Sequence, residues 1–212
     1  RVSFDELLEM TATGCPKPAM RSVEYARSHG VRLHIRSAFT WQEGTWVEEE
    51  VPEMEQAIVS AVTHDLSEAK MTILGVPDRP GVAARLFRAL ADLDVNVDMI
   101  VQNVSDHGVT DISFTVPHHE LDRSMVLSKE LVEELGASGS TADTGVARVS
   151  VIGAGMRTNP GVAASMFETL SDRGINIQMI STSAIRVSCM VDVARIEYAV
   201  EALHNVFGLA EA

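Results

Sequence analysis

The protein has 212 residues, of which 46% are hydrophobic and 22% are charged, a composition ordinary for a globular protein. Its 17 basic and 30 acidic residues give a formal net charge of −13, which argues against a nucleic-acid-binding surface. The apolar runs are too short to cross a membrane, and Cys15 and Cys189 are too few for a disulfide framework and match no metal spacing. We therefore expect a cytoplasmic protein without a nucleic-acid, membrane or metal partner. The sequence opens at Arg1 with no signal peptide, so we expect a chain trimmed or cut from something longer.

The first 45 residues contain two predicted helices and one predicted strand. The first helix runs from Ser3 to Met10, because Ser3 is a good N-cap and Glu6 follows three residues later, as in a capping box. A second helix is expected over residues 19–28, and residues 31–35 have the pattern of a strand. So few elements cannot bury their own apolar faces, so we expect this segment to need missing material from elsewhere.

Glutamates crowd the next stretch around Pro52, at positions Glu43, Glu48, Glu49, Glu50, Glu53 and Glu55. A solvated linker explains such a run better than a metal site, because neighbouring carboxylates repel one another and extend the chain. We therefore place a domain boundary in an acidic linker over residues 44–56.

An internal repeat organises the rest of the chain. When the sequence is shifted by 80 positions, Pro80-Gly81-Val82-Ala83-Ala84 falls on Pro160-Gly161-Val162-Ala163-Ala164. Residues 80–100 and 160–180 share 11 identities in 21 aligned positions, where chance would give about one or two. The chain therefore contains two related domains, because a period this long is not that of a solenoid.

Each copy reads as strand, helix, strand, strand, helix. In the first copy, Val82, Leu86, Leu90 and Leu93 form an apolar helical stripe, and from Val95 the apolar residues alternate as in a strand. We expect strands over 71–76, 95–101 and 110–116, a helix beginning at Pro80, a turn near 106–108, and a helix over 119–135 that stops at Gly136.

The second copy repeats this order. We expect strands over 149–152, 176–181 and 185–192, and helices over 160–173 and 193–206. Two such units predict an α+β fold, with two ferredoxin-like βαββαβ sandwiches in which helices cover one face of an antiparallel sheet.

The turn before the first helix of each copy is a candidate binding site. The first N–H groups of a helix lack intrahelical partners and carry partial positive charge, and Gly81 and Ala83 are small enough to admit a ligand. A free amino acid would fit, with its carboxylate on these N–H groups and its ammonium on Asp78 or Asp98. The neighbouring strand supplies polar residues that could orient such a ligand: Asn96, Asp98 and Gln102. The second copy repeats the turn at Asn159-Pro160-Gly161 and the polar residue at Asn176, which favours a binding site. The residues alone leave open a second interpretation, in which Pro-Gly only begins a helix and the polar residues face water.

Signals for catalysis are poor. Gly153-Ala154-Gly155 follows a predicted strand, but the next glycine is Gly161, so the dinucleotide-binding fingerprint is missing. The sequence has no phosphate-binding loop, zinc-protease motif or hydrolase elbow. An enzyme built on Asp98 and His118 would lack a nucleophile, a phosphate loop and a metal cluster. We therefore assign no catalytic residue, cofactor or metal to this chain.

Several runs resemble the regulatory region of aspartate kinase, which carries tandem ACT domains. Residues 67–75, Asp78-Arg79-Pro80-Gly81, 96–105 and 110–115 are similar to the first ACT domain of that family, and residues 149–156 and 180–183 to the second. Residues 21–27 and 31–37 resemble the end of the family's amino-acid-kinase domain. The resemblance extends over nearly the whole chain, in the family's order.

The resemblance implies a regulatory role. Aspartate kinases use ATP to phosphorylate the side-chain carboxylate of L-aspartate, the first step toward lysine, threonine, methionine and isoleucine. Their ACT domains pair into dimers and bind threonine or lysine as feedback effectors, and some members make a separate β subunit of little more than this region. ATP and Mg²⁺ would bind in the kinase domain, so this chain would hold no cofactor of its own and would need a catalytic subunit or domain as partner.

The resemblance also implies a domain organisation. Residues 1–43 would be the tail of the kinase domain, followed by the acidic linker over 44–56. The first ACT domain would cover 65–143, and the second would be assembled from 57–64 and 144–212, because in this family the strand before the first ACT domain completes the second sheet. The alternative is a stand-alone ACT amino-acid sensor, and the kinase-like N-terminal segment speaks against it.

Position by position, the resemblance implies two effector sites. The threonine-type site would use Asp78, Gly81, Ala83 and Gln102, with Asn176 and Ile177 from a paired second ACT domain. The lysine-type site would use Asp98 with residues around Ala163, Ser183 and Ala184. Many lysine-responsive relatives have His, Thr, Glu and Glu where this chain has Asn159, Ala163, Gln178 and Ala184, so two carboxylates that could bind an ammonium are missing. We therefore predict retained threonine binding and weak or absent lysine binding.

Overall fold

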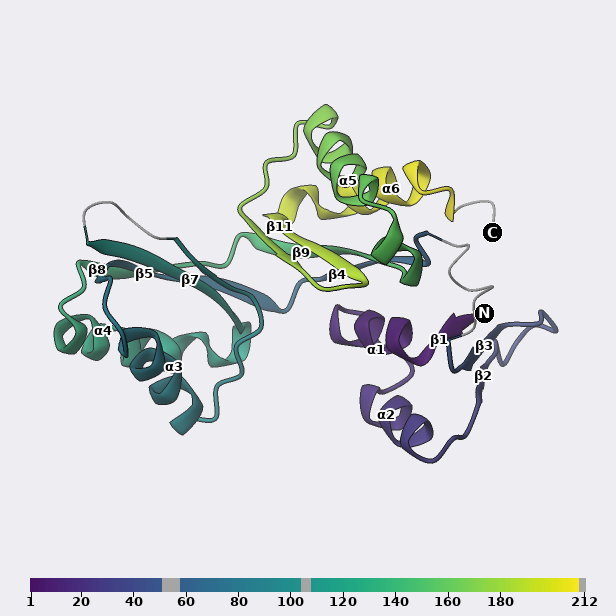
Figure 1. The fold of residues 1–212 in the computed structure, drawn as a ribbon, viewed down its shortest axis with the longest axis horizontal. Helices are drawn as coiled ribbons and strands as arrows, with labels where there is room; N and C mark the ends of the chain where they lie inside the picture. Colours follow the sequence, from purple (N-terminus) through teal and green to yellow (C-terminus); the bar gives the residue numbers. More distant parts are fainter. Residues whose placement is uncertain (51–57, 104–107, 210–212) are drawn as a thin grey trace. The chain divides into compact units, whose positions relative to one another are not determined.

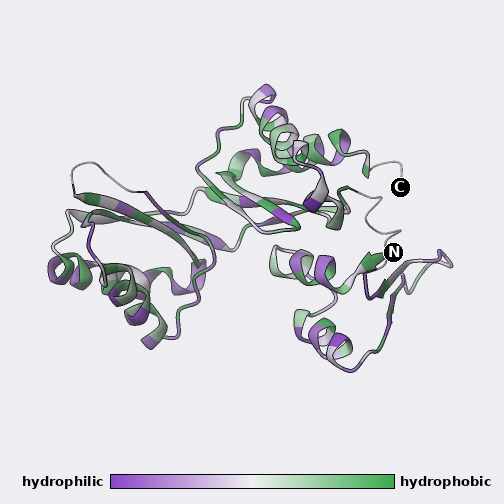
Figure 2. Cartoon of the chain, in the orientation of Figure 1, coloured by the Kyte–Doolittle hydropathy of each residue, from purple (hydrophilic) through white to green (hydrophobic). Residues whose placement is uncertain are grey.

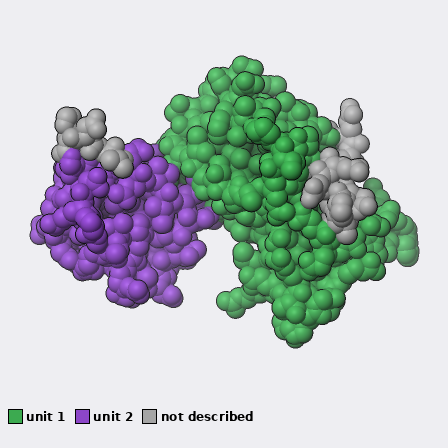
Figure 3. Space-filling model, viewed as in Figure 1, with its two compact units in different colours: residues 1–65, 148–212 green, residues 66–147 purple. Residues whose placement is uncertain are grey.

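The computed structural model describes residues 1–50, 58–103 and 108–209. The chain divides into two compact units, unit 1 of residues 1–65 with 148–212 and unit 2 of residues 66–147 (Figures 1 and 3). The chain therefore leaves unit 1 after Asp65 and returns to it at Arg148. Among the described residues, no helix has both the length and the apolar character needed to span a bilayer.

Unit 2 is a four-stranded antiparallel sheet with two helices on one face (Figure 1). The strand order is β6-β7-β5-β8. Its elements are β5 (Glu68–Pro77), α3 (Val82–Asp92), β6 (Ile100–Gln102), β7 (Val109–Pro117), α4 (Leu121–Leu135) and β8 (Gly139–Asp143). This is the βαββαβ ferredoxin-like arrangement that the repeat predicts.

The core of unit 2 follows from the apolar stripe of each helix. Leu86 and Leu90 of α3 and Leu131 of α4 are buried against the sheet, where Phe114 of β7 is fully buried. Along both helices apolar and polar positions alternate at helical spacing, as Figure 2 shows. The predicted end of α4 at Gly136 is confirmed, because Gly136 adopts a left-handed conformation (φ 73°) that favours glycine.

Unit 1 contains the second sheet, of order β10-β11-β9-β4. Its elements are β4 (Ala61–Asp65), β9 (Val146–Ile152), α5 (Gly161–Asp172), β10 (Met179–Thr182), β11 (Arg186–Asp192) and α6 (Ile196–Val206). Strand β4 precedes unit 2 in the sequence and pairs antiparallel with β9, so a segment from before the first domain supplies the fourth strand of the second. Both predicted ferredoxin-like sandwiches are therefore present.

The N-terminal segment of unit 1 forms β1 (Val2–Ser3), α1 (Phe4–Ala12), α2 (Met20–Ser28), β2 (Leu33–Ile35) and β3 (Thr45–Glu48). The predicted capping box is confirmed, because the Ser3 hydroxyl accepts from the Glu6 amide and the Glu6 carboxylate accepts from the Ser3 amide. Apolar residues of this segment, among them Phe4, Leu7 and Met10, form a cluster with Ile152 of β9. The segment therefore buries its apolar face on the second domain.

The acidic linker prediction is wrong for residues 45–48. These residues form β3, which pairs with β1 and β2, and Val47 is fully buried in this sheet. Glu48 pairs with Arg1 and Arg32, at 3.2 Å in each case, so its charge is compensated within the segment. The inward positions of this strand, Thr45 and Val47, were hard to recognise within a run of glutamates. Glu53 and Glu55 of the same run lie outside the described residues.

Two strand predictions need shortening, and β8 was missed, as were β1 and β3. The first-copy strand expected over 95–101 is regular only at Ile100–Gln102, because the Met99 amide donates to the Thr115 hydroxyl at 3.1 Å and makes the pairing before Ile100 irregular. Its second-copy equivalent begins at Met179 rather than at residue 176. Strand β8 has the sequence Gly-Ser-Thr-Ala-Asp, without the apolar run from which a strand could be predicted. The turn expected near 106–108 lies largely outside the described residues.

Candidate functional site

The turn between β5 and α3 is the first part of the candidate site. The Asp78 amide donates to the Gly108 carbonyl at 3.0 Å, which fixes the turn beside the start of β7. Gly81 is the N-cap of α3 and has φ 95°, and a Cβ atom built on it would meet nothing within 4 Å. Within the described residues, no side chain caps this helix. The start of α3 therefore faces open space at Gly81. The Val82 amide donates to the Arg79 carbonyl at 3.5 Å, and the other N–H groups of the first turn have no intrahelical partner and can meet an anion.

Strands β5 and β6 both run antiparallel to β7, so Gln102 at the end of β6 lies toward the end of the sheet where β5 leads into this turn. Gln102 is paired with Ile112 of β7, which is paired in turn with Ile73 of β5. Beyond the Gln102–Ile112 pair, the Thr110 hydroxyl donates to the Asn103 carbonyl and joins the end of β6 to the beginning of β7. The end of β6 therefore lies nearer to the turn than its beginning does. Of the predicted threonine-type residues of unit 2, Ala83 is half-buried and the others are exposed: Asp78, Gly81, Ala83 and Gln102.

Asn96 and Asp98 lie before the beginning of β6. The Asp98 amide donates to the carbonyl of Thr115, which is paired with Lys70 near the start of β5. Seven residues separate Lys70 from Pro77, about 23 Å of strand. Asp98 therefore lies farther along the strands from the Asp78 turn of the same domain than Gln102 does, and its place in a ligand site with Asp78 stays a prediction. Alternation along one strand does not tell which end of the strand a ligand would occupy.

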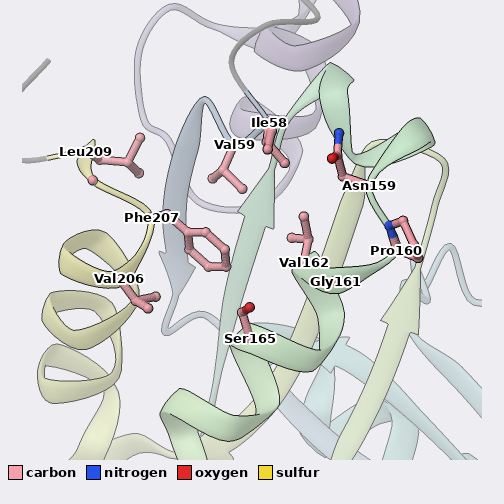
Figure 4. A pocket seen from close by; sticks show the side chains of 11 residues that line it. Ile58, Val59, Asn159, Pro160, Gly161, Val162, Ser165, Val206, Phe207 and Leu209 are labelled. Atoms are coloured by element: carbon pink, nitrogen blue, oxygen red, sulfur yellow. The ribbon is translucent and has the colours of Figure 1, made fainter.

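The equivalent turn of the second domain borders a hollow of about 650 Å³ (Figure 4). The start of α5 lines one side through Gly161 and Val162, and Phe207 after α6 lines the other. The side-chain amide of Asn159 donates to the Gly155 carbonyl at 2.8 Å, so this residue holds its own turn. The hollow is mainly apolar, and the predicted residue Ala163 is half-buried one turn into the helix.

Asn176 and Ile177 line a different hollow of unit 1. This depression of about 400 Å³ also includes Phe167 and Ser171 of α5. Asn176 is exposed, as a residue contributed to a paired domain would have to be.

Ser183 is engaged by a residue that sequence reasoning missed. It lies in the turn after β10, and its hydroxyl donates to the Glu9 carboxylate of α1 at 3.0 Å. Glu9 also pairs with Arg186 of β11 at 3.0 Å. A carboxylate of the N-terminal segment thus lines the same hollow as Ser183 and Ala184. No local signal marks Glu9, which is 174 residues away from Ser183 in the sequence.

Glu6, predicted only as the capping-box residue of α1, is a buried carboxylate with partners on three segments. It accepts from the amide and hydroxyl of Ser3, the hydroxyl of Ser60 at 2.5 Å and the amide of Ala154 at 3.0 Å. Burial raises the pKa of Glu6, but the hydrogen bonds from Ser3, Ser60 and Ala154 outweigh it and leave the pKa below its ordinary value. Glu6 therefore fastens α1 to the second domain as an ionised carboxylate.

Comparison with known proteins bears on the identity of both domains. The ACT domain family matches residues 70–125 and, separately, residues 149–207. An aspartokinase of Mycolicibacterium smegmatis is 47% identical over 213 residues, an alignment that includes 98% of this chain and 50% of that protein. The chain thus spans about half the length of this relative, and its N-terminal segment is part of the match.

Solved structures agree with these matches. A crystal structure of aspartokinase α and β subunits is 43% identical with a TM-score of 0.67, and the match covers 71% of this chain and 99% of that one. The ligand-free regulatory subunit of aspartate kinase from Thermus thermophilus is 34% identical with a TM-score of 0.67, over 70% of this chain and 97% of the subunit. The chain belongs to the aspartokinase family and comprises its regulatory region, with two ACT domains.

Proposed function

We propose that this chain is the regulatory half of an aspartokinase and that unit 2, its first ACT domain, binds L-threonine as a feedback effector. The observation that carries the proposal is the open start of α3 at Gly81, with Asp78 in the turn before it, half-buried Ala83 in its first turn, and Gln102 exposed at the end of β6. The start of α3 supplies N–H groups for the threonine carboxylate, and Asp78 supplies a countercharge for its ammonium. Gln102 supplies an amide for the side-chain hydroxyl.

Lysine is the weaker effector candidate. Its side-chain ammonium would need a carboxylate near Ser183, where Ala184 and Gln178 supply none. Glu9, which lies beside Ser183, is already paired with Arg186. A lysine would have to displace that ion pair, and a charge-assisted contact contributes about 1.5–3 kcal/mol.

The catalytic part belongs, in this proposal, to the half of the protein outside this chain. The N-terminal segment up to β3 is the end of the kinase domain, and ATP, Mg²⁺ and L-aspartate bind in the remainder. ACT domains of two copies pair, so that Asn176 and Ile177 of one copy complete the threonine site of the other. The 212-residue chain alone is then expected to show no turnover of ATP and L-aspartate.

The test is calorimetric titration of this chain with L-threonine, using Asp78→Asn and the matched variant Asp98→Asn. Both carboxylates are exposed on unit 2, but Asp98 lies farther along the strands from the start of α3. Loss of the ammonium partner should weaken threonine binding by about tenfold or more in D78N, whereas D98N should bind like the wild type. Absence of binding to the wild-type chain, or equal affinity for D78N, would contradict the proposal.

A further inference from the structure

Two aromatic side chains of the N-terminal segment lie almost entirely in solvent. Phe39 and Trp41 are 97% and 95% exposed, the largest exposed fractions of any large apolar side chain in the described part of the chain. Both belong to the loop of residues 36–44 that joins β2 to β3, which we call the aromatic loop, and this loop extends beyond the other elements of the segment (Figure 1). Single exposed apolar residues are normal, but two large aromatic ones in one loop form a patch of the kind that marks an interaction site.

The aromatic loop is closed tightly at its base. The His34 ring nitrogen Nε2 donates to the Glu43 carbonyl at 2.6 Å. Gly44 has φ 78°, and an added Cβ there would lie 2.3 Å from the Ile35 carbonyl oxygen, so the two ends of the loop are in close contact. A loop that is ordered before it binds loses less conformational entropy on association. The aromatic side chains are therefore held out on a shaped loop, which suits an interface.

The sheet from which the loop extends has helices on one face. Val47, which is fully buried, and Leu33 belong to the apolar cluster formed with α1 and α2. Because side chains alternate along a strand, His34 and Trp46 point to the opposite face. There the two rings stack with their centroids 3.8 Å apart, and the Arg32 guanidinium lies 5.2 Å from the Trp46 ring. His34 is exposed on this second face and Trp46 is half-buried.

The pairing of the strands indicates that this second face is covered in the whole protein. Strand β1 pairs with β3 in parallel, Val2 opposite Val47. Parallel strands are joined by crossovers that place helices against the sheet, and they lie mostly in sheets with both faces covered. Here α1 and α2 form the crossover and cover one face. The other face and the aromatic loop beside it therefore call for a layer of protein from outside this segment.

We propose that the aromatic loop and the His34–Trp46 face are the docking surface for the kinase part, with Phe39 and Trp41 as its anchoring side chains. The aspartokinases that match nearly the whole chain, its N-terminal segment included, are about twice as long, so these relatives possess a further part large enough to cover the surface. Buried aromatic side chains contribute most of the binding energy in many interfaces. This inference rests on the proposed function for the presence of a kinase part and names the surface that receives it.

The experiment compares hydroxyl-radical labelling of the 212-residue chain with that of the protein that also carries its kinase part, read residue by residue by mass spectrometry. Phe39 and Trp41 should be oxidised rapidly in the 212-residue chain. In the longer protein their oxidation rates should fall by about tenfold, because anchoring side chains of an interface are almost fully desolvated. Tyr198, 40% exposed on α6 of the second ACT domain, is the internal control and should react equally in both proteins.

A substitution gives an independent measurement. Trp41→Ala should leave the unfolding temperature of the 212-residue chain unchanged, because the side chain is exposed there, and should lower that of the longer protein. The matched variant is Val126→Ala, which truncates a side chain that is 62% exposed on α4 of unit 2 and should lower neither temperature. Labelling of the wild type needs no variant, so it decides the inference where W41A does not fold in the longer protein.

Two results would overturn the inference. One is equally rapid oxidation of Phe39 and Trp41 in both proteins. The other is protection that develops in the 212-residue chain alone as its concentration is raised, because the occupant of the surface would then be a second copy.

The outcomes for docking and for the proposed function are distinguishable. If L-threonine does not bind in the calorimetric titration, the effector proposal fails, while the labelling comparison still decides the docking. If threonine binds and Phe39 and Trp41 remain unprotected in the longer protein, only the docking inference fails.

Discussion

Glu6 is a carboxylate whose removal should be felt by the whole N-terminal segment. Its four donors come from Ser3, Ser60 and Ala154, and the residue is 1% exposed. In Glu6→Gln the amide nitrogen faces donors, so we expect a loss of about 1.5–3 kcal/mol in the free energy of unfolding. Urea denaturation at pH 7 measures it, with Glu24→Gln on the exposed face of α2 as the matched control. Equal stability of E6Q and E24Q would refute this role of Glu6.

The pH dependence of that loss follows from the direction of the pKa shift. The pKa of Glu6 is lowered from 4.5 in the folded protein, since hydrogen bonds from Ser3, Ser60 and Ala154 outweigh the effect of burial. The contribution of the ionised carboxylate is therefore complete above pH 4.5 and is lost as the pH falls through the folded value. The stability difference between wild type and E6Q should be constant from pH 6 to 7 and should shrink below about pH 4.5. A difference that grows on acidification would contradict the assignment.

The two cysteines should differ sharply in reactivity. Burial raises the pKa of the Cys189 thiol to about 12, and this residue is fully buried in β11. Since the thiolate is the reactive form, Cys189 should resist iodoacetamide at pH 8. Cys15 is half-buried in the N-terminal segment and should be modified. Mass spectrometry of the native and urea-unfolded chain checks this, and labelling of native Cys189 at the rate of Cys15 would count against the buried position.

At the scale of elements, the seating of α1 on β4 predicts unequal effects at two glycines. Gly14 (φ 115°) and Gly30 (φ 63°) both have left-handed backbone, but only at Gly14 would a Cβ collide, with the His64 carbonyl. Gly30→Ala should cost about 1–2 kcal/mol from the backbone conformation alone. Gly14→Ala should cost clearly more, because α1 must also move away from β4. Urea denaturation of the two variants gives the comparison, and a G14A no less stable than G30A would mean that α1 is not held there.

Elements with a local signal could be predicted from the sequence. Ser3 and Glu6 mark the start of α1, Gly136 marks the end of α4, and the 80-residue repeat gives both ferredoxin-like folds. Strand β3 could not be found, because tertiary burial of Val47 overrides the charge of its neighbours. Strand β8 is polar and is defined by its pairing with β5 rather than by its own residues.

The candidate site was predictable only where a local sequence pattern marks it. The Asp78–Gly81 turn carries a local pattern, and Gln102 joins it through a short β-ladder. The position of Asp98 along the strands relative to this turn follows only from the register of the sheet. Contacts that join distant segments, such as Glu6 with Ala154 and Arg148 with Ala12, leave no trace in local patterns.

At the scale of the whole molecule, the chain combines two ACT domains with an N-terminal segment packed on the second of them. The segment shares an apolar cluster with Ile152 of β9, and Glu6, Glu9 and Arg148 provide its polar contacts. The crossing at Asp65 and Arg148 links the first ACT domain to the strand pair on which α1 rests.

Thermal unfolding of this chain during titration with L-threonine and, separately, with L-lysine tests whether the regulatory region binds threonine in preference to lysine. A ligand that binds only the folded state adds about 2.7 kcal/mol to the free energy of unfolding at 100 times its dissociation constant. We expect a saturable rise of the unfolding temperature with threonine, and a much smaller rise, or none, with lysine. No shift with threonine, or a shift with lysine at equally low concentration, would contradict it.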